Sequence, residues 1–177
     1  MRALGRLVIV VLAVAFLAGA WDARHPDRGP LEGLGAPTRD DPVVLAHDTR
    51  TPPRLAAVRR SRHEAFDRIT FEFRGALSRT TVRYVRELPR DAAGRPQELA
   101  GDADLAVSFV ATARDGAGRP SFRGRARARP LWPALREYAL VSEADGRVVF
   151  GLGTDRRLSF RVIELDNPVR VVVDVAN

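Results

Sequence analysis

Residues 158–175 read LSFRVIELDNPVRVVVDV, and this stretch decides the fold class. Apolar and polar side chains alternate up to Leu165, three turn residues interrupt the pattern at 166–168, and a β-branched run follows from 169 to 175. Such a sequence predicts a β-hairpin. On its second strand the even-numbered Arg170 and Asp174 lie opposite the core-facing valines, so we expect Asp174 to pair with an arginine of a neighbouring strand.

The preceding part of the chain carries the same alternation. In the clearest segment, 66–73, Ile69, Phe71 and Phe73 face one way and charged or hydroxyl side chains the other, as in a half-buried antiparallel strand. Further strands are predicted at 54–62, 80–87, 105–112, 138–141 and 147–152. About eight short strands with turn signals between them predict an all-β fold, an antiparallel β-sandwich. Local propensity also allows a helical turn over 133–137.

The first 53 residues are predicted to lie outside this domain. Residues 1–20 resemble an export signal, with Arg2 and Arg6 before an apolar run and a small-residue cleavage site at 18–20. The apolar run is shorter than the ~20 residues that span a bilayer, so we expect contact with the membrane only during export, although an uncleaved anchor stays open. Residues 21–53 are predicted to be a flexible linker rich in Pro and Gly, in which 43–45 is an apolar patch able to dock as an edge strand. The folded domain is predicted at 54–177.

Composition excludes several classes of site. The chain has no cysteine, which excludes disulfides, thiolate metal sites and a cysteine nucleophile. All 29 basic residues are arginine and the net charge is +7, which favours anionic surfaces. The arginines are spread along the chain without a clustered stripe, so we expect no nucleic-acid partner.

The candidate ligand surface lies in the second long loop, 113–133. Alternate arginines in an extended loop would place four guanidinium groups on one side, where they suit carboxylates or phosphates, and nearby aromatic rings suit sugars. The predicted ligand-binding residues are Arg123, Arg125, Arg127, Arg129, Trp132 and Tyr138. The alternative is a solvated loop with Trp132 packed beneath it.

No residue set amounts to a catalytic or metal site. His63 is the one histidine of the predicted domain, and no nucleophile elbow surrounds any serine. Asp102 and Asp104 would share a strand face, and they suit turn capping better than calcium binding. We therefore predict no enzyme activity, no cofactor and no metal.

Two loops repeat a pattern, Asp-x-Ala-Gly-Arg-Pro, at 91–96 and 115–120. They are either a pair of ligand-binding loops or two ordinary turns, since Asp, Gly and Pro are turn residues. One strand separates them, which would place them about 25 Å apart.

The closing stretch, 160–175, resembles the end of an AMIN domain, which has an apolar strand, a Pro-x-Arg turn and a valine-rich strand carrying an Asp. Residues 66–73 and 147–155 are similar to the corresponding parts of the AMIN-like domain of actinobacterial secreted proteins and lipoproteins. Ala20 stands where the lipoproteins carry their lipidated cysteine.

The resemblance implies a module of the cell envelope, since AMIN domains target envelope proteins to peptidoglycan. We therefore expect an exported module, secreted or wall-associated, that binds peptidoglycan or an anionic wall polymer. The alternative is a module for protein interaction or self-association through a sheet edge. The expected partner is a cell-wall polymer or an envelope protein.

Overall fold

The chain ends in the predicted hairpin. β9 (Phe160–Leu165) and β10 (Val169–Ala176) are antiparallel, and the turn between them contains a cis peptide bond before Pro168. β10 also pairs along its whole length with β3 (Phe66–Arg74), the strand with the clearest alternation. The prediction of a closing hairpin is confirmed.

A computed structural model describes Leu31 and residues 33–49, 51–91 and 93–177. The predicted export signal lies outside these residues. The chain divides into two units, Met1–Leu34 and Gly35–Asn177, and every described strand belongs to the second. The remaining strands are β1 (Val43–Ala46), β2 (Arg54–Arg62), β4 (Arg79–Val85), β5 (Ala103–Val110), β6 (Arg127–Ala128), β7 (Leu135–Ala144) and β8 (Arg147–Thr154).

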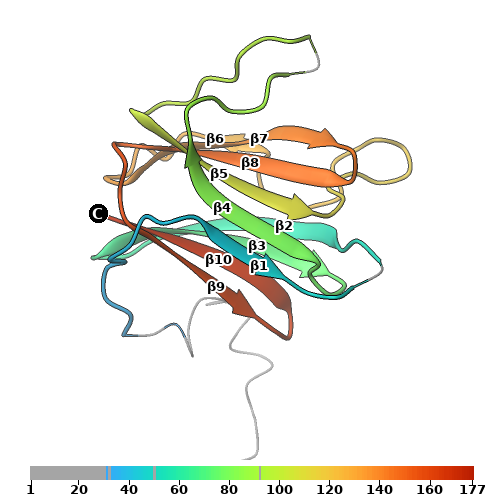
Figure 1. The fold of residues 1–177 in the computed structure, drawn as a ribbon, viewed down its shortest axis with the longest axis horizontal. Coiled ribbons are helices and arrows are strands. Elements are labelled where there is room, and N and C mark those ends of the chain that lie inside the picture. The colour runs from blue at the N-terminus through green and yellow to red at the C-terminus, as the bar shows by residue number, and fades with distance from the viewer. Residues whose placement is uncertain (1–30, 32, 50, 92) are drawn as a thin grey trace, which may run out of the picture. The chain divides into compact units, whose positions relative to one another are not determined.

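The strands form two antiparallel sheets that face each other (Figure 1). The six-stranded sheet has the order β1-β4-β5-β8-β7-β6, and the four-stranded sheet has the order β2-β3-β10-β9. No helix occurs among the described residues. The predicted all-β sandwich is confirmed, with β1 and β6 added to the eight strands expected.

The core lies between the sheets and is centred on phenylalanine rings. Phe71 of the four-stranded sheet stands 5.0 Å, centroid to centroid, from both Phe109 and Phe150 of the six-stranded sheet. The odd-numbered valines of β10 complete this side, and Val171 and Val173 are fully buried. Strand alternation therefore places one face of each sheet in a single apolar core.

The apolar patch at 43–45 docks as an edge strand. β1 pairs with β4, with Val43 opposite Val82 and Ala46 opposite Arg79. The unit that holds both sheets begins at Gly35, so part of the predicted linker belongs to the fold.

Residues 35–49, here called the strap, also contact the other sheet. The carbonyl of Arg39 accepts a hydrogen bond from the backbone of Phe160 at 2.6 Å. Near the other end of the strap, His47 Nε2 lies 2.7 Å from a carboxylate oxygen of Glu164. The strap thus joins β4 of one sheet to β9 of the other.

The helical turn allowed at 133–137 does not form. β7 begins at Leu135, which lies opposite Thr154 of β8. The backbone N–H groups of Ala134 and Leu135 both donate to the buried carboxylate of Asp67 at 2.9 Å. Ladder pairing and this carboxylate satisfy the backbone groups that a helical turn would otherwise satisfy locally.

The two repeated loops have the same internal structure. Asp91 Oδ1 accepts hydrogen bonds from the backbone of residues 93 and 95, and Asp115 Oδ1 accepts them from residues 117 and 119. In both loops the arginine before the aspartate donates to the glycine carbonyl, at 3.0 Å and 2.7 Å. The repeat thus forms two self-contained turns.

Candidate functional site

The outer face of the six-stranded sheet carries a groove of about 740 Å³. Four strands supply its floor, and the segment that follows β4 supplies one side. Its lining residues are Thr81, Arg83, Val85, Glu87, Leu88, Pro89, Arg90, Ala106, Ser108, Ser142, Ala144, Asp145, Arg147 and Val149. A smaller hollow of about 290 Å³ continues it toward β1 and adds Val44, Arg79 and Val110.

Strand register places a row of small side chains across the floor. Thr81 of β4 lies opposite Ser108 of β5, Ser108 lies opposite Val149 of β8, and Val149 lies opposite Ser142 of β7. These four residues form one row across the sheet, here called the hydroxyl row. Three of its members are small hydroxyl side chains, which both donate and accept hydrogen bonds.

Arginines stand on both sides of the hydroxyl row. On one side, Arg79 and Arg147 share a cross-strand row with Val110 between them, because Thr80 pairs with Phe109 and Val110 pairs with Arg147. On the other side, Arg83 lies opposite Ala106. Arg79 and Arg83 are four residues apart on β4, which corresponds to about 13 Å along an extended strand.

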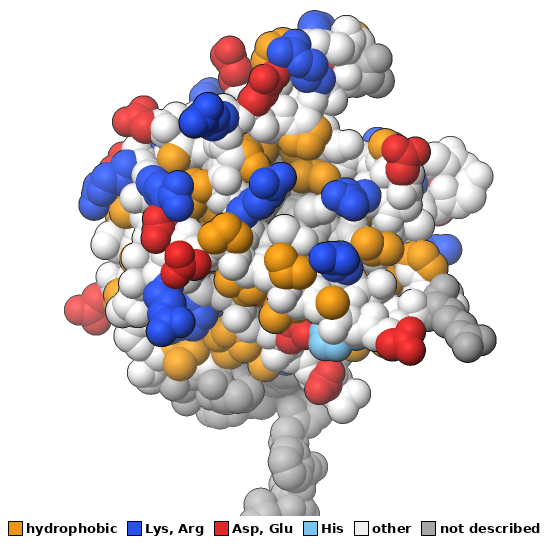
Figure 2. Space-filling view, in the orientation of Figure 1, with side chains coloured by type: hydrophobic (Ala, Val, Ile, Leu, Met, Phe, Trp, Pro, Cys, Tyr) orange, Lys and Arg blue, Asp and Glu red, His pale blue; other side chains and the backbone are white. Residues whose placement is uncertain are grey.

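Within the part of the chain that the structure describes, Arg79, Arg83 and Arg147 form no ion pair. The lining also contains Arg90, which pairs with Glu87 at 2.6 Å. Asp145 is the other carboxylate of the lining. Figure 2 shows the side of the molecule that carries β4, where basic side chains stand apart from one another among hydrophobic ones. The groove therefore has an excess of guanidinium groups, which remain charged at any physiological pH.

The segment between β4 and β5, of which the structure describes residues 86–91 and 93–102, forms the wall of the groove. In Figure 1 it rises above the six-stranded sheet. It packs on β8 at two glycines: a Cβ at Gly151 would stand 2.7 Å from Leu88 Cδ1, and one at Gly153 would overlap the carbonyl oxygen of Ala100. The wall docks because β8 has no side chains there.

Glu137 anchors the end of this wall. Its side chain is 1% exposed, and its carboxylate accepts hydrogen bonds from Ala100 N at 2.8 Å, Arg127 Nε at 2.6 Å and Arg129 Nε at 3.0 Å. Burial raises the pKa of Glu137, but the Ala100 hydrogen bond and the two guanidinium groups outweigh it, so the pKa lies below its usual value.

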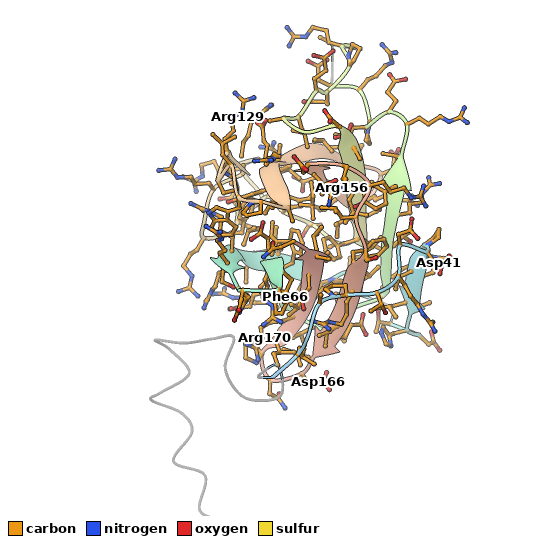
Figure 3. All side chains as sticks on the ribbon, turned by 90° about the vertical axis from the view of Figure 1, so that its left-hand side faces the viewer. Asp41, Phe66, Arg129, Arg156, Asp166 and Arg170 are labelled. Carbon is orange, nitrogen blue, oxygen red and sulfur yellow. The ribbon has the colours of Figure 1, made fainter. Side chains whose placement is uncertain are left out.

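The predicted arginine run is separate from this groove, and three of its four arginines lie close to carboxylates. Arg127 and Arg129 pair with Glu137, and a nitrogen of Arg123 lies 3.9 Å from a carboxylate oxygen of Glu72. Among the described residues, only Arg125 of the run has no ion pair. Figure 3 shows Arg129 at the upper left of that view, well separated from Phe66 and Arg170.

The two predicted aromatic residues belong to the core side of the sheet. Tyr138 is 1% exposed and lies in the main core, and Trp132 packs against that core. The ring of Tyr138 is therefore not on a ligand surface, because β7 alternation turns it inward. This matches the alternative in which Trp132 packs beneath the loop. Ligand binding by the four arginines stays a prediction.

The expected partner of Asp174 is present. Arg68 of β3 donates to it from Nε at 2.6 Å and from Nη2 at 3.0 Å, and Arg161 of β9 adds a bond of 2.6 Å. The side chains of Arg68 and Asp174 have no exposed surface. This is a structural ion pair, because guanidinium and carboxylate compensate each other's burial.

The remaining candidate residues have structural contacts. His63 stacks on Phe66 with 4.5 Å between ring centroids, and its Nε2 lies 3.1 Å from Ser61 Oγ. Asp102 bonds through its backbone to Thr154, and burial raises the pKa of Asp104. The described residues contain no group of three or more His, Asp or Glu side chains that could hold a metal ion.

None of the described residues belongs to a helix long and apolar enough to cross a membrane. No curated protein and no solved structure matches the chain. A family model described as the AMIN-like domain matches residues 53–177, which include both strands of the closing hairpin. The match indicates an extracytoplasmic module related to the cell envelope. The chain therefore belongs to the AMIN-like domain family.

Proposed function

We propose that this chain is a non-catalytic, exported module that binds an anionic cell-envelope polymer in the groove on the six-stranded sheet. The observation that carries the proposal is the convergence of Arg79, Arg83 and Arg147 on one groove without ion-pair partners among the described residues. Unpaired guanidinium groups attract carboxylates and phosphates and bind them through paired N–H donors.

The chemistry of the groove favours binding over catalysis. Guanidinium groups do not lose their protons near neutral pH, so they supply fixed charge and hydrogen bonds but no proton transfer. The hydroxyl row supplies further hydrogen bonds to a ligand that lies on the floor. Membership of an envelope-related family makes a wall polymer the natural source of such a ligand.

The test is retention on insoluble cell-wall sacculi, with and without their attached phosphate polymers, at low and high salt. We expect retention at low salt that is lost at high salt, because exposed charges are screened. Loss of retention on stripped sacculi would identify the attached polymer as the ligand, and equal retention would identify peptidoglycan itself.

Two double variants locate the site. The groove variant Arg83→Ala with Arg147→Ala is expected to abolish retention. The matched variant Arg123→Ala with Arg125→Ala removes the same charge from the loop and is expected to leave retention unchanged. The reverse result would return the site to the arginine run, and absence of retention by the unmodified protein would refute the proposed function.

A second candidate function rests on β1, which is an end strand of the six-stranded sheet. Val44 in this strand is 51% exposed, and the backbone groups of an end strand can pair with another strand. Self-association through β1 predicts a concentration-dependent dimer by light scattering, which Val44→Asp would abolish.

A further inference from the structure

The groove is elongated across the strands, and this restricts the shape of the ligand that it can bind. The hydroxyl row crosses β4, β5, β8 and β7 at right angles to the strands, and Val44 of β1 extends it because Val44 lies opposite Thr81. Four steps between neighbouring strands, from β1 to β7, correspond to about 19 Å. The floor is therefore a trough that runs across the sheet.

The two sides of the trough differ in construction. One side carries Arg79 and Arg147, which share one cross-strand row, and the smaller hollow continues the groove there toward β1. The other side carries Arg83, and next to it the wall segment covers the glycine positions of β8. A ligand cannot continue along the strands on that side, because Leu88 and Ala100 occupy the space above Gly151 and Gly153.

We propose, as an extension of the proposed function, that the trough binds a linear polyanion that lies across the strands over the hydroxyl row. Such a chain meets Arg83 on one side and Arg79 and Arg147 on the other, so at least two of its anionic groups are bound at the same time. None of the described residues that line the groove or its smaller hollow is aromatic, so they offer no platform on which a sugar ring would stack.

The guanidinium and hydroxyl groups of the trough favour a ligand that mainly accepts hydrogen bonds. Guanidinium groups donate and do not accept, and hydroxyl groups adjust to whichever partner is offered. Phosphate and carboxylate groups only accept when ionised. Polymers with phosphodiester groups and polymers with carboxylate groups both have this chemistry.

The experiment compares ligands of increasing length by isothermal titration calorimetry on the folded protein. The probes are glycerol 3-phosphate, synthetic poly(glycerol phosphate) oligomers of two to eight repeats, and oligogalacturonates of matched length. Linking the bound groups makes the second contact intramolecular, so we expect oligomers that span the trough to bind on the order of a hundredfold more tightly than the monomer. Tighter binding by one series identifies the anionic group.

Three variants test the orientation. Ser108→Phe fills the middle of the trough without changing charge and is expected to weaken oligomer binding at least tenfold, while monomer binding at a single guanidinium changes little. Arg83→Ala is expected to lower the slope of log K against log salt concentration by about one, because each charge contact releases about one counterion. Arg125→Ala, which removes an exposed arginine outside the groove, is expected to leave that slope unchanged.

Circular dichroism and thermal unfolding establish that each variant is folded before binding is compared. Affinity that does not depend on ligand length, or tight oligomer binding that Ser108→Phe leaves intact, would overturn the proposal. Retention on sacculi without length dependence would refute this inference and leave the proposed function standing, whereas absence of retention would refute the proposed function.

Discussion

Two sets of arginines in this molecule have the same side chain and opposite surroundings. Arg127 and Arg129 of the basic run share one buried carboxylate, that of Glu137. Arg83 and Arg147 of the groove come from separate strands and have no ion-pair partner among the described residues. A cluster of charges in sequence therefore does not identify a binding surface; the position of the opposite charges decides which guanidinium groups remain available.

The largest expected effect concerns the fully buried ion pair between Arg68 and Asp174. Asp174→Ala removes the carboxylate between Arg68 and Arg161, and Arg68 has no exposed surface through which water could replace it. We expect a loss of about 3–5 kcal/mol in the free energy of unfolding, measured by urea denaturation. A loss below about 1 kcal/mol would show that Arg68 gains solvent.

The wall of the groove gives the next largest effect. Gly153→Ala places a methyl group against the carbonyl of Ala100 and is expected to cost up to about 3 kcal/mol and to displace the wall segment. The matched control is Gly116→Ala, where an added Cβ meets nothing within 4 Å. Faster amide hydrogen exchange at 98–102 in the first variant alone would confirm that this docking forms the wall.

Glu137 pairs with two arginines of the run and also anchors the wall of the groove through Ala100. Glu137→Gln is expected to lower the free energy of unfolding by about 1–2 kcal/mol. Glu87→Gln is the control, since its side chain is 53% exposed and, among the described residues, pairs with Arg90 alone. Equal stability of the two variants would contradict the anchoring role.

The contribution of Glu137 to folding stability is expected to decrease at low pH. The pKa of Glu137 is lowered in the folded state, so its contribution is complete above the unfolded value of about 4.3 and is lost as the pH falls through the folded value. The pKa of Asp104 is raised by burial, so its titration has the opposite sign. Unfolding of the native chain and of Glu137→Gln from pH 7 to pH 2.5 should therefore converge at low pH.

The smallest effect is expected in the repeated loops. Hydrogen bonds from the Arg95 backbone and side chain lower the pKa of Asp91, and those from Arg119 do the same for Asp115. Both pairs are exposed to solvent, where ion pairs contribute little. We expect Asp91→Ala to leave the unfolding midpoint nearly unchanged and to speed amide exchange at residues 93 and 95 only, and Asp115→Ala to act likewise on its own loop.

Strand alternation was sufficient to predict most of the fold. The predicted strand 54–62 coincides with β2, and the other seven predicted strands also form. The partner of Asp174 was predictable because a regular strand places residue 174 on the face opposite Val171 and Val173. The turn residues between runs supplied the hairpin connections.

The groove was not predictable from the same patterns. Its arginines come from β4 and β8, which are 60 residues or more apart in sequence, and β5 lies between them in the sheet. Alternation assigns Arg83 to an outward face but does not state which strands are neighbours. The ion pairs of the run were not predictable for a related reason, because Glu137 was assigned to a possible helical turn, whereas in β7 it lies beside the short strand β6.

The strap has a practical consequence for work on this family. The family match begins at residue 53, but β1 covers the outer edge of β4 ten residues earlier. A recombinant fragment cut at the family boundary would expose the N–H and C=O groups of β4 as a bare edge, the kind of surface on which chains stack into insoluble aggregates. Fragments that start at Gly35 keep that edge covered and should stay monodisperse at concentrations where the shorter ones precipitate.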